Sequence, residues 1–170
     1  MNIYYLFFFL VIFGCTTKKE EPKEVGWTKE RSMELNKTIA AEEKIKIQLF
    51  LEQHKSWKMI NSGSGLQYFI YENGTGEQPK AGSSVDVQYS ISLLDGTLCY
   101  KTEEDEVVEI KVDHSQVETG VQEGLKKMKV GDKAKMIIPS HLAHGLTGDL
   151  DKIPPLTPII VDINLIEIVE

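Results

Sequence analysis

The side chains that most often carry out chemistry are few and scattered in this sequence. Cys15 closes an apolar run and Cys99 lies far along the chain, so two thiols in such different contexts predict no disulfide framework. The histidines are His54, His114, His141 and His144. His141 and His144 are three residues apart, but no thiol or carboxylate cluster accompanies them, and zinc sites need clustered ligands. We therefore expect neither a metal site nor a cofactor.

Cys15 is the residue whose surroundings predict a modification. Residues 3–13 are apolar, yet at about 1.5 Å per residue they are too short to cross a hydrocarbon core of about 30 Å as a helix. The run ends at Gly14-Cys15 before a polar segment rich in Lys and Glu, which resembles a bacterial lipobox, although Phe13 departs from its usual small residue. We expect a lipoprotein signal peptide over 1–15, acyl chains on Cys15 and a disordered tether over 16–27. A cleaved soluble form and an uncleaved anchor are the alternatives.

Length and charge limit the remaining possibilities. A chain of 170 residues has room for one ordinary domain and an appendage. Its net charge of −7 predicts no nucleic-acid binding, because that function usually needs a basic patch.

Residues 28–60 have the composition of a helical stem. From Thr28, a candidate N-cap, to about Trp57 the segment lacks Gly and Pro. The apolar residues that share one arc of a helical wheel are Leu35, Ile39, Ile45, Leu49 and Phe50. Glu42 and Lys46 fall inside that arc and argue against a long coiled coil. The stem is either a spacer or homodimerisation helix, or a helix that docks on the domain.

Residues 61–170 are predicted to form the globular domain. Asn61 to Gly65 is a small-residue boundary, after which apolar and polar residues alternate with the period of a strand. Such alternation occurs at 85–93, 108–112, 134–138 and 159–168, and Asp95-Gly96 predicts a hairpin turn. Only 116–128 has helical spacing. We therefore predict an α+β fold in which a curved antiparallel sheet wraps one short helix.

Several short motifs in this domain have a characteristic order. They are Tyr89, Leu94-Asp95-Gly96-Thr97, Gly120 to Leu125, Met128 to Ala134, Ile138-Pro139, Ala143-His144-Gly145 and Ile153-Pro154-Pro155. In this order and spacing, residues 66–170 resemble an FKBP-type peptidyl-prolyl isomerase domain. The chain is most similar to the FKBP lipoproteins associated with gliding motility in Bacteroidetes. This resemblance rests on the lipobox, the helical stem and the string Pro139 to Ala143.

The resemblance implies an enzyme that rotates X-Pro bonds. Rotation faces a barrier of about 18–20 kcal/mol but breaks no bond, so it needs a water-poor pocket rather than a nucleophile. By resemblance the catalytic positions are Tyr89, Tyr100, Glu118 and His144. In the family the backbone N–H at the Glu118 position receives a substrate carbonyl. The substrate-binding positions implied in the same way are Cys99, Val108, Val117, Val121, Ile153 and Val161.

Some of these positions depart from the family pattern. Val121 replaces the usual Trp, and aromatic residues are also replaced at Cys99, Val108 and Val161. Tyr100 stands in place of an Asp, and His144 in place of a Tyr whose hydroxyl bonds ligand carbonyls. We expect an apolar but wider pocket. Core packing is the alternative explanation for the three valines, and a buried hydrophobe that for Cys99.

Three functions follow from these observations. The first is a prolyl isomerase that helps proline-containing client proteins fold in the bacterial cell envelope, held by Cys15 at the outer membrane and facing the periplasm. The second is an FKBP-fold binding or assembly module with little catalysis. In the third, the stem is the functional part and the domain caps it.

Overall fold

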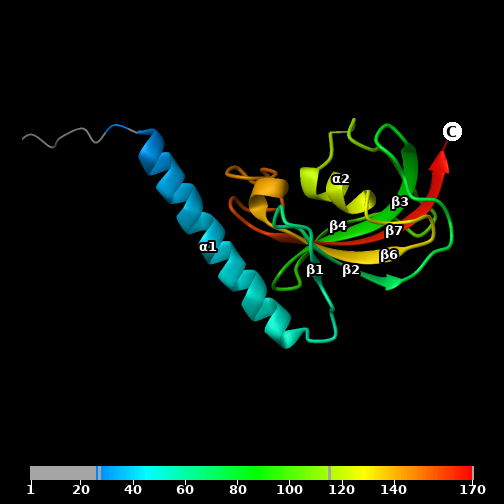
Figure 1. Ribbon diagram of the computed structural model, residues 1–170, viewed down its shortest axis with the longest axis horizontal. Helices are drawn as coiled ribbons and strands as arrows, with labels where there is room; N and C mark the ends of the chain where they lie inside the picture. The colour runs from blue at the N-terminus through cyan, green and yellow to red at the C-terminus, as the bar shows by residue number, and fades with distance from the viewer. Residues whose placement is uncertain (1–25, 27, 115, 170) are drawn as a thin grey trace, which may run out of the picture.

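The fold is built on one antiparallel sheet. The computed structural model describes residue 26 and residues 28–114 and 116–169. The strands are β1 (Ile60–Asn61), β2 (Gln67–Glu72), β3 (Ser84–Leu93), β4 (Leu98–Lys101), β5 (Val108–Lys111), β6 (Lys133–Ile138) and β7 (Ile159–Val169). They pair in the order β1-β2-β6-β7-β3-β4, and β5 also pairs with β3. β3 and β7 pair from Ser84 opposite Val169 to Leu93 opposite Ile159, so these two strands form the centre of the sheet (Figure 1).

Helix α2 (Thr119–Leu125) packs on one face of this sheet. Two glycines allow the close approach: a Cβ on Gly120 would lie 2.3 Å from Cγ2 of Ile138, and one on Gly124 would lie 2.3 Å from Sδ of Met136. α2 is shorter than the predicted 116–128, because Glu118 is its N-cap and Lys126 its C-cap. The predicted α+β fold, a curved antiparallel sheet around one short helix, is confirmed.

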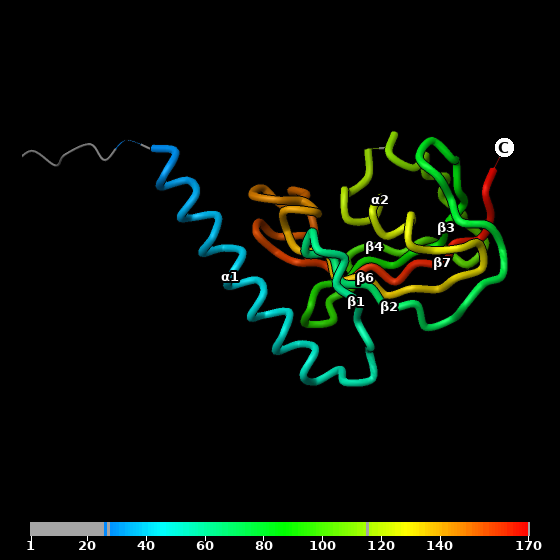
Figure 2. Tube along the Cα trace, viewed as in Figure 1, coloured from blue at the N-terminus to red at the C-terminus, as the bar shows by residue number. Residues whose placement is uncertain are grey.

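Helix α1 (Lys29–Gln53) packs on the other face. Successive strand residues point to opposite faces, so Ile137 and Ile160 turn away from the α2 side. These two isoleucines are cross-strand partners and form a small cluster with Ile47 of α1. In Figures 1 and 2, α2 lies above the sheet and the C-terminal end of α1 lies below it. The stem therefore docks on the domain.

The apolar arc of the stem coincides only in part with the buried side of α1, since Ile39 and Phe50 are half-buried. Leu35, Ile45 and Leu49 are exposed, whereas Glu43 and Ile47 are buried. The residue at the centre of the docking face is the carboxylate Glu43, so the apolar residues of α1 do not mark that face. The helix begins after Thr28, whose side chain accepts from the Arg31 N–H as an N-cap should, and it ends before Trp57.

The predicted boundary segment 61–65 begins within the sheet. β1 pairs with β2 through Ile60 opposite Tyr68 and Asn61 opposite Gln67. Residues 62–66 form the turn between these strands, and the Ser64 hydroxyl donates to Glu123 at 2.7 Å. The predicted boundary between residues 60 and 61 thus falls inside β1.

The predicted signal peptide, Cys15 and most of the tether lie outside the described residues. Within the described part, no helix combines the length and the apolar composition needed to span a membrane.

Candidate active site

A cavity of about 170 Å³ lies between the start of α2 and the sheet. Residues two apart on a strand point to the same face, and cross-strand partners lie side by side. Tyr89 opposite Ile163 and Ile91 opposite Val161 therefore enter the cavity together. The full lining is Tyr89, Ile91, Val108, Ile110, Gln116, Val117, Glu118, Val121, Val161 and Ile163. The structure thus brings together the predicted residues Tyr89, Val108, Val117, Glu118, Val121 and Val161.

The cavity wall is mainly aliphatic, and its polar positions are a phenol, a carboxylate and the amide of Gln116. Val121 is 5% exposed and Val161 is 1% exposed, so water has little access to this part of the wall. Burial raises the pKa of Tyr89, and the negative charges of Glu118 and Glu106 raise it further. The Tyr89 hydroxyl therefore stays protonated and can donate a hydrogen bond.

Glu118 connects the cavity to the long loop that follows β6. It is the N-cap of α2, but its side chain makes no capping hydrogen bond. Its Oε1 atom lies instead 2.9 Å from Nε2 of His144. This contact has ion-pair distance but not the angles of a hydrogen bond, because Nε2 has no hydrogen-bond partner among the described residues. The pair becomes a full ion pair when His144 is protonated.

Tyr100 and Asp149 form a second polar pair beside His144. The Tyr100 hydroxyl donates to Oδ2 of Asp149, and Oδ1 accepts from the N–H groups of Asp151 at 2.9 Å and Ile153 at 2.7 Å. Loss of water raises the pKa of Asp149, but these hydrogen bonds and the charge of His144 outweigh that effect and lower it to about 2. The bond to Asp149, with loss of water, raises the pKa of Tyr100 to about 12. The pair therefore holds the 149–153 segment with a carboxylate and a neutral phenol.

The family assignment follows from the sequence that builds this cavity. Residues 75–166, which contain all of the cavity lining, match the family of FKBP-type peptidyl-prolyl cis-trans isomerases. The chain belongs to the FKBP-type isomerase family. The family predicted from the sequence is therefore confirmed.

Relatives from bacteria support the same assignment. The chain is 33% identical to a probable FKBP-type isomerase, FkpA, of Neisseria meningitidis, over 81% of this chain and 51% of that protein. It is 36% identical to the outer membrane protein MIP of Legionella longbeachae, over 81% of this chain and 59% of that protein. The chain therefore spans about half of the length of these curated relatives.

Solved structures of two bacterial proteins have the same fold. The crystal structure of FkpA from Escherichia coli matches with a TM-score of 0.66 and 33% identity, covering 82% of this chain and 63% of that one. An isomerase from Pseudomonas syringae matches with a TM-score of 0.62 and 27% identity, covering 85% of this chain and 98% of that one.

The remaining predicted residues of this FKBP domain lie around or behind the cavity. His144 does not line the cavity but contacts Glu118, which does, and Tyr100 is bonded to Asp149 of the same loop. Cys99 and Ile153 are 3% and 1% exposed and belong to the core rather than to the cavity lining. The Cys99 thiol lies 3.8 Å from the carbonyls of Thr97 and Lys152, and burial raises its pKa. Cys99 is therefore placed as a buried hydrophobe.

Sequence reasoning missed several residues of the site. Ile91, Ile110 and Ile163 line the cavity, and each lies two positions from a predicted lining residue on the same strand, so the strand period could have revealed them. Gln116 was missed because the residues before α2 have no periodic pattern. Asp149 precedes a turn and accepts from the N–H two residues later, which is a typical role of Asp.

Proposed function

We propose that this chain is a peptidyl-prolyl cis-trans isomerase acting on proline-containing protein clients. The observation that carries the proposal is the apolar cavity in an FKBP domain, with its wall of strand residues and its few polar groups. The planar amide before proline is polar, and water stabilises it. A water-poor cavity lowers the barrier because it binds the twisted amide better than the planar forms.

The polar groups at the rim orient the substrate in this proposal. Tyr89 offers a neutral hydroxyl, and the turn at Glu118 is where the family's backbone N–H receives a carbonyl. His144 contacts Glu118 of the cavity lining, and in this proposal its ring donates one N–H to a bound carbonyl. Tyr100 fixes the 149–153 segment through Asp149, while Cys99 and Ile153 support the cavity wall from behind.

A proline-limited refolding assay on the full chain tests this function. Val117→Arg places a charge in the cavity, whereas Val107→Arg makes the same change at an exposed position outside the lining. We expect the wild type and Val107→Arg to accelerate refolding, and Val117→Arg to lose most of the acceleration. A wild type that gives no acceleration, even at equimolar concentration, would refute the isomerase function.

The second candidate function is an FKBP-fold binding or assembly module. It is supported by the Glu118–His144 contact, which puts an imidazole and a carboxylate beside the apolar wall, and by the aliphatic side chain of Val121. Saturable binding of a proline peptide, blocked by Val117→Arg but without rate acceleration, would favour this function.

We also propose that the protein is a lipoprotein of the bacterial cell envelope, anchored by acyl chains on Cys15 in the outer membrane and facing the periplasm. The apolar run over 3–13, the Gly14-Cys15 ending and the polar segment behind it support this. Labelled fatty acid should appear on the wild type and disappear in Cys15→Ser. Recovery of unacylated, freely soluble wild type would contradict the anchor.

Two finer proposals concern relatives and partners. The string Pro139 to Ala143 supports membership of the FKBP lipoproteins associated with gliding motility, and deletion of the gene in a gliding host should then abolish spreading.

The exposed Ile45 and Leu49 lie one turn apart on α1 and support a homodimer through the stem. Sedimentation of Ile45→Lys against the wild type tests it, because a dimer through this face should dissociate.

A further inference from the structure

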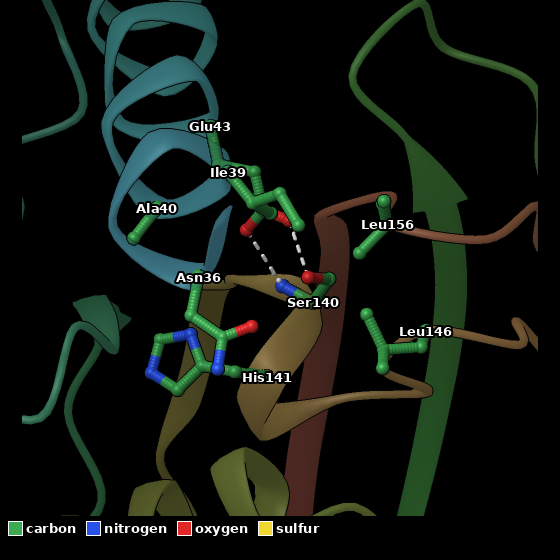
Figure 3. A pocket seen from close by; sticks show the side chains of 9 residues that line it. Asn36, Ile39, Ala40, Glu43, Ser140, His141, Leu146 and Leu156 are labelled. Carbon is green, nitrogen blue, oxygen red and sulfur yellow. Dashed lines mark hydrogen bonds between the residues drawn. The ribbon is translucent and has the colours of Figure 1, made fainter. Parts of the chain in front are cut away.

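Glu43 is a carboxylate buried between α1 and the domain. Glu43 is only 3% exposed. The Oε2 atom accepts from the backbone N–H of Ser140 at 2.9 Å, and Oε1 accepts from the Ser140 hydroxyl (Figure 3). Burying a carboxylate is costly unless its oxygens are hydrogen-bonded. Both oxygens are satisfied by one residue, so the contact fixes the distance between α1 and Ser140.

Ser140 begins the turn that carries His144. Residues Ser140–Leu142 form a short 3-10 helix, and the Ser140 carbonyl accepts from the N–H groups of Ala143 at 3.0 Å and Gly145 at 2.8 Å. His144 lies between these two donors, and its ring reaches Glu118 at the rim of the cavity. A continuous series of contacts therefore leads from Glu43 through the turn to the candidate active site.

The space on both sides of the Glu43 contact is open. One cavity of about 440 Å³ is lined by Glu43 and Ser140 together with Ile39, Leu146 and Leu156. Another, of about 300 Å³, is lined by Glu43 and His141 together with Ile47 and Pro139. In Figure 3, Leu146 and Leu156 face the helix across the first cavity. Because apolar packing is incomplete here, the carboxylate has a large share in holding the turn against α1.

We propose that Glu43 is a positioning residue for the prolyl site, which acts by fixing Ser140 and thereby the turn that presents His144 to Glu118. This proposal rests on the proposed isomerase function only for its effect on rate. Its effect on the position of His144 is independent of that function. The stem then acts as a part of the active-site framework and not only as a spacer.

Three single variants of the full chain, and one double variant, test the role of Glu43. Glu43→Ala removes both hydrogen bonds, whereas Glu43→Gln keeps an oxygen for the Ser140 N–H and an amide for the hydroxyl. Glu42→Ala makes the same charge change at the exposed neighbouring residue and is the matched control. Each variant is measured by amide hydrogen exchange at Ala143 and Gly145, by the ring signals of His144 in NMR spectra, and by kcat and KM for a proline peptide.

We expect Glu43→Ala to speed exchange at Ala143 and Gly145, to shift the His144 ring signals and to lower kcat/KM about three- to tenfold. Exchange in β3 and β7 should stay at the wild-type rate, which shows that the domain remains folded. Glu43→Gln should recover most of each effect, and Glu42→Ala should match the wild type. The double variant Glu43→Ala with Ser140→Ala should behave like Glu43→Ala alone, because both residues act through one contact.

Unchanged His144 signals and unchanged exchange in folded Glu43→Ala would overturn the proposal. If Glu43→Gln is as impaired as Glu43→Ala, the hydrogen bonds are not the cause and the proposal is also wrong. A wild type without isomerase activity would refute the proposed function alone, because exchange and ring signals still decide whether Glu43 positions the turn.

Discussion

The Nε2 atom of His144 lies 2.9 Å from Oε1 of Glu118, which joins the loop after β6 to the first turn of α2. The two residues come from segments that approach each other only in the folded domain, and both side chains are mostly buried. Because Glu118 also lines the cavity, we expect a change in the loop to reach the cavity through this contact. The predictions below test this contact and the packing that supports it.

Replacement of His144 should slow turnover without unfolding the domain. The proposed hydrogen bond from the His144 ring to a substrate carbonyl should contribute about 0.5–1.5 kcal/mol. His144→Ala should therefore reduce kcat/KM by about two- to tenfold. His144→Tyr should retain more activity, since the hydroxyl is a neutral donor. The assay is isomerisation of a proline peptide, with His114→Ala as an exposed histidine control. If both His144 variants equal the wild type, His144 has no role at the site.

Removal of the Tyr100 hydroxyl should raise the pKa of Asp149 from about 2 toward its ordinary value of 3.8, because the hydroxyl is a main cause of the depression. A depressed carboxylate pKa stabilises the folded state above the unfolded pKa and loses that effect as pH falls toward the folded one. Acid unfolding of Tyr100→Phe should therefore begin at a higher pH. NMR titration of the Asp149 carboxyl measures the shift, and an unchanged pKa in Tyr100→Phe would contradict the hydrogen bond.

Alanine at Gly120 should cost more stability than alanine at Gly124. At Gly120 the new methyl group meets the branched side chain of Ile138, whereas at Gly124 it meets the flexible end of Met136, which can move away. Overpacking costs about 1–3 kcal/mol, and the higher helix propensity of Ala returns about 1 kcal/mol at both sites. We expect Gly120→Ala to be less stable than Gly124→Ala by about 1–2 kcal/mol in urea unfolding. Equal urea midpoints for the two variants would show that α2 can shift as a unit on the sheet.

A fragment that begins at Lys58 should fold, because it keeps β1 and the whole sheet. Loss of α1 exposes Ile137 and Ile160, so the fragment should be less stable by about 2–4 kcal/mol, the burial free energy of one or two such side chains. Thermal unfolding should remain cooperative. Ile137→Ser should destabilise the full chain much more than the fragment, and a fragment that stays unfolded would show that α1 completes the core.

The sheet could be predicted because period-two alternation follows directly from strand geometry. Val85, Val87 and Ile91 alternate with polar residues, and all three are buried. β1 could not be found in this way, since two residues contain no period. The docking face of α1 could not be predicted for a different reason. Its central residue is a buried carboxylate, and a hydrophobicity pattern treats Glu43 as solvent-facing.

The candidate site was predictable where family motifs and strand period coincide. Tyr89, Val108 and Val161 satisfy both criteria and line the cavity. The contacts of the long loop could not be predicted from the sequence, because residues 140–158 are held by individual hydrogen bonds with no repeating pattern. Thus neither the bond from Tyr100 to Asp149 nor that from Ser140 to Glu43 has a signal in residue spacing.

The docking of α1 also has a mechanical meaning. A helix of 25 residues is a stiff rod of about 37 Å, and its buried residues Glu43 and Ile47 lie in its second half. The first half projects past the point of attachment and forms a lever arm. A sideways force near Lys29 would reach the domain as a torque around Ile47, with Glu43 one helical turn from the pivot. Load on the stem would therefore be felt first at Ser140.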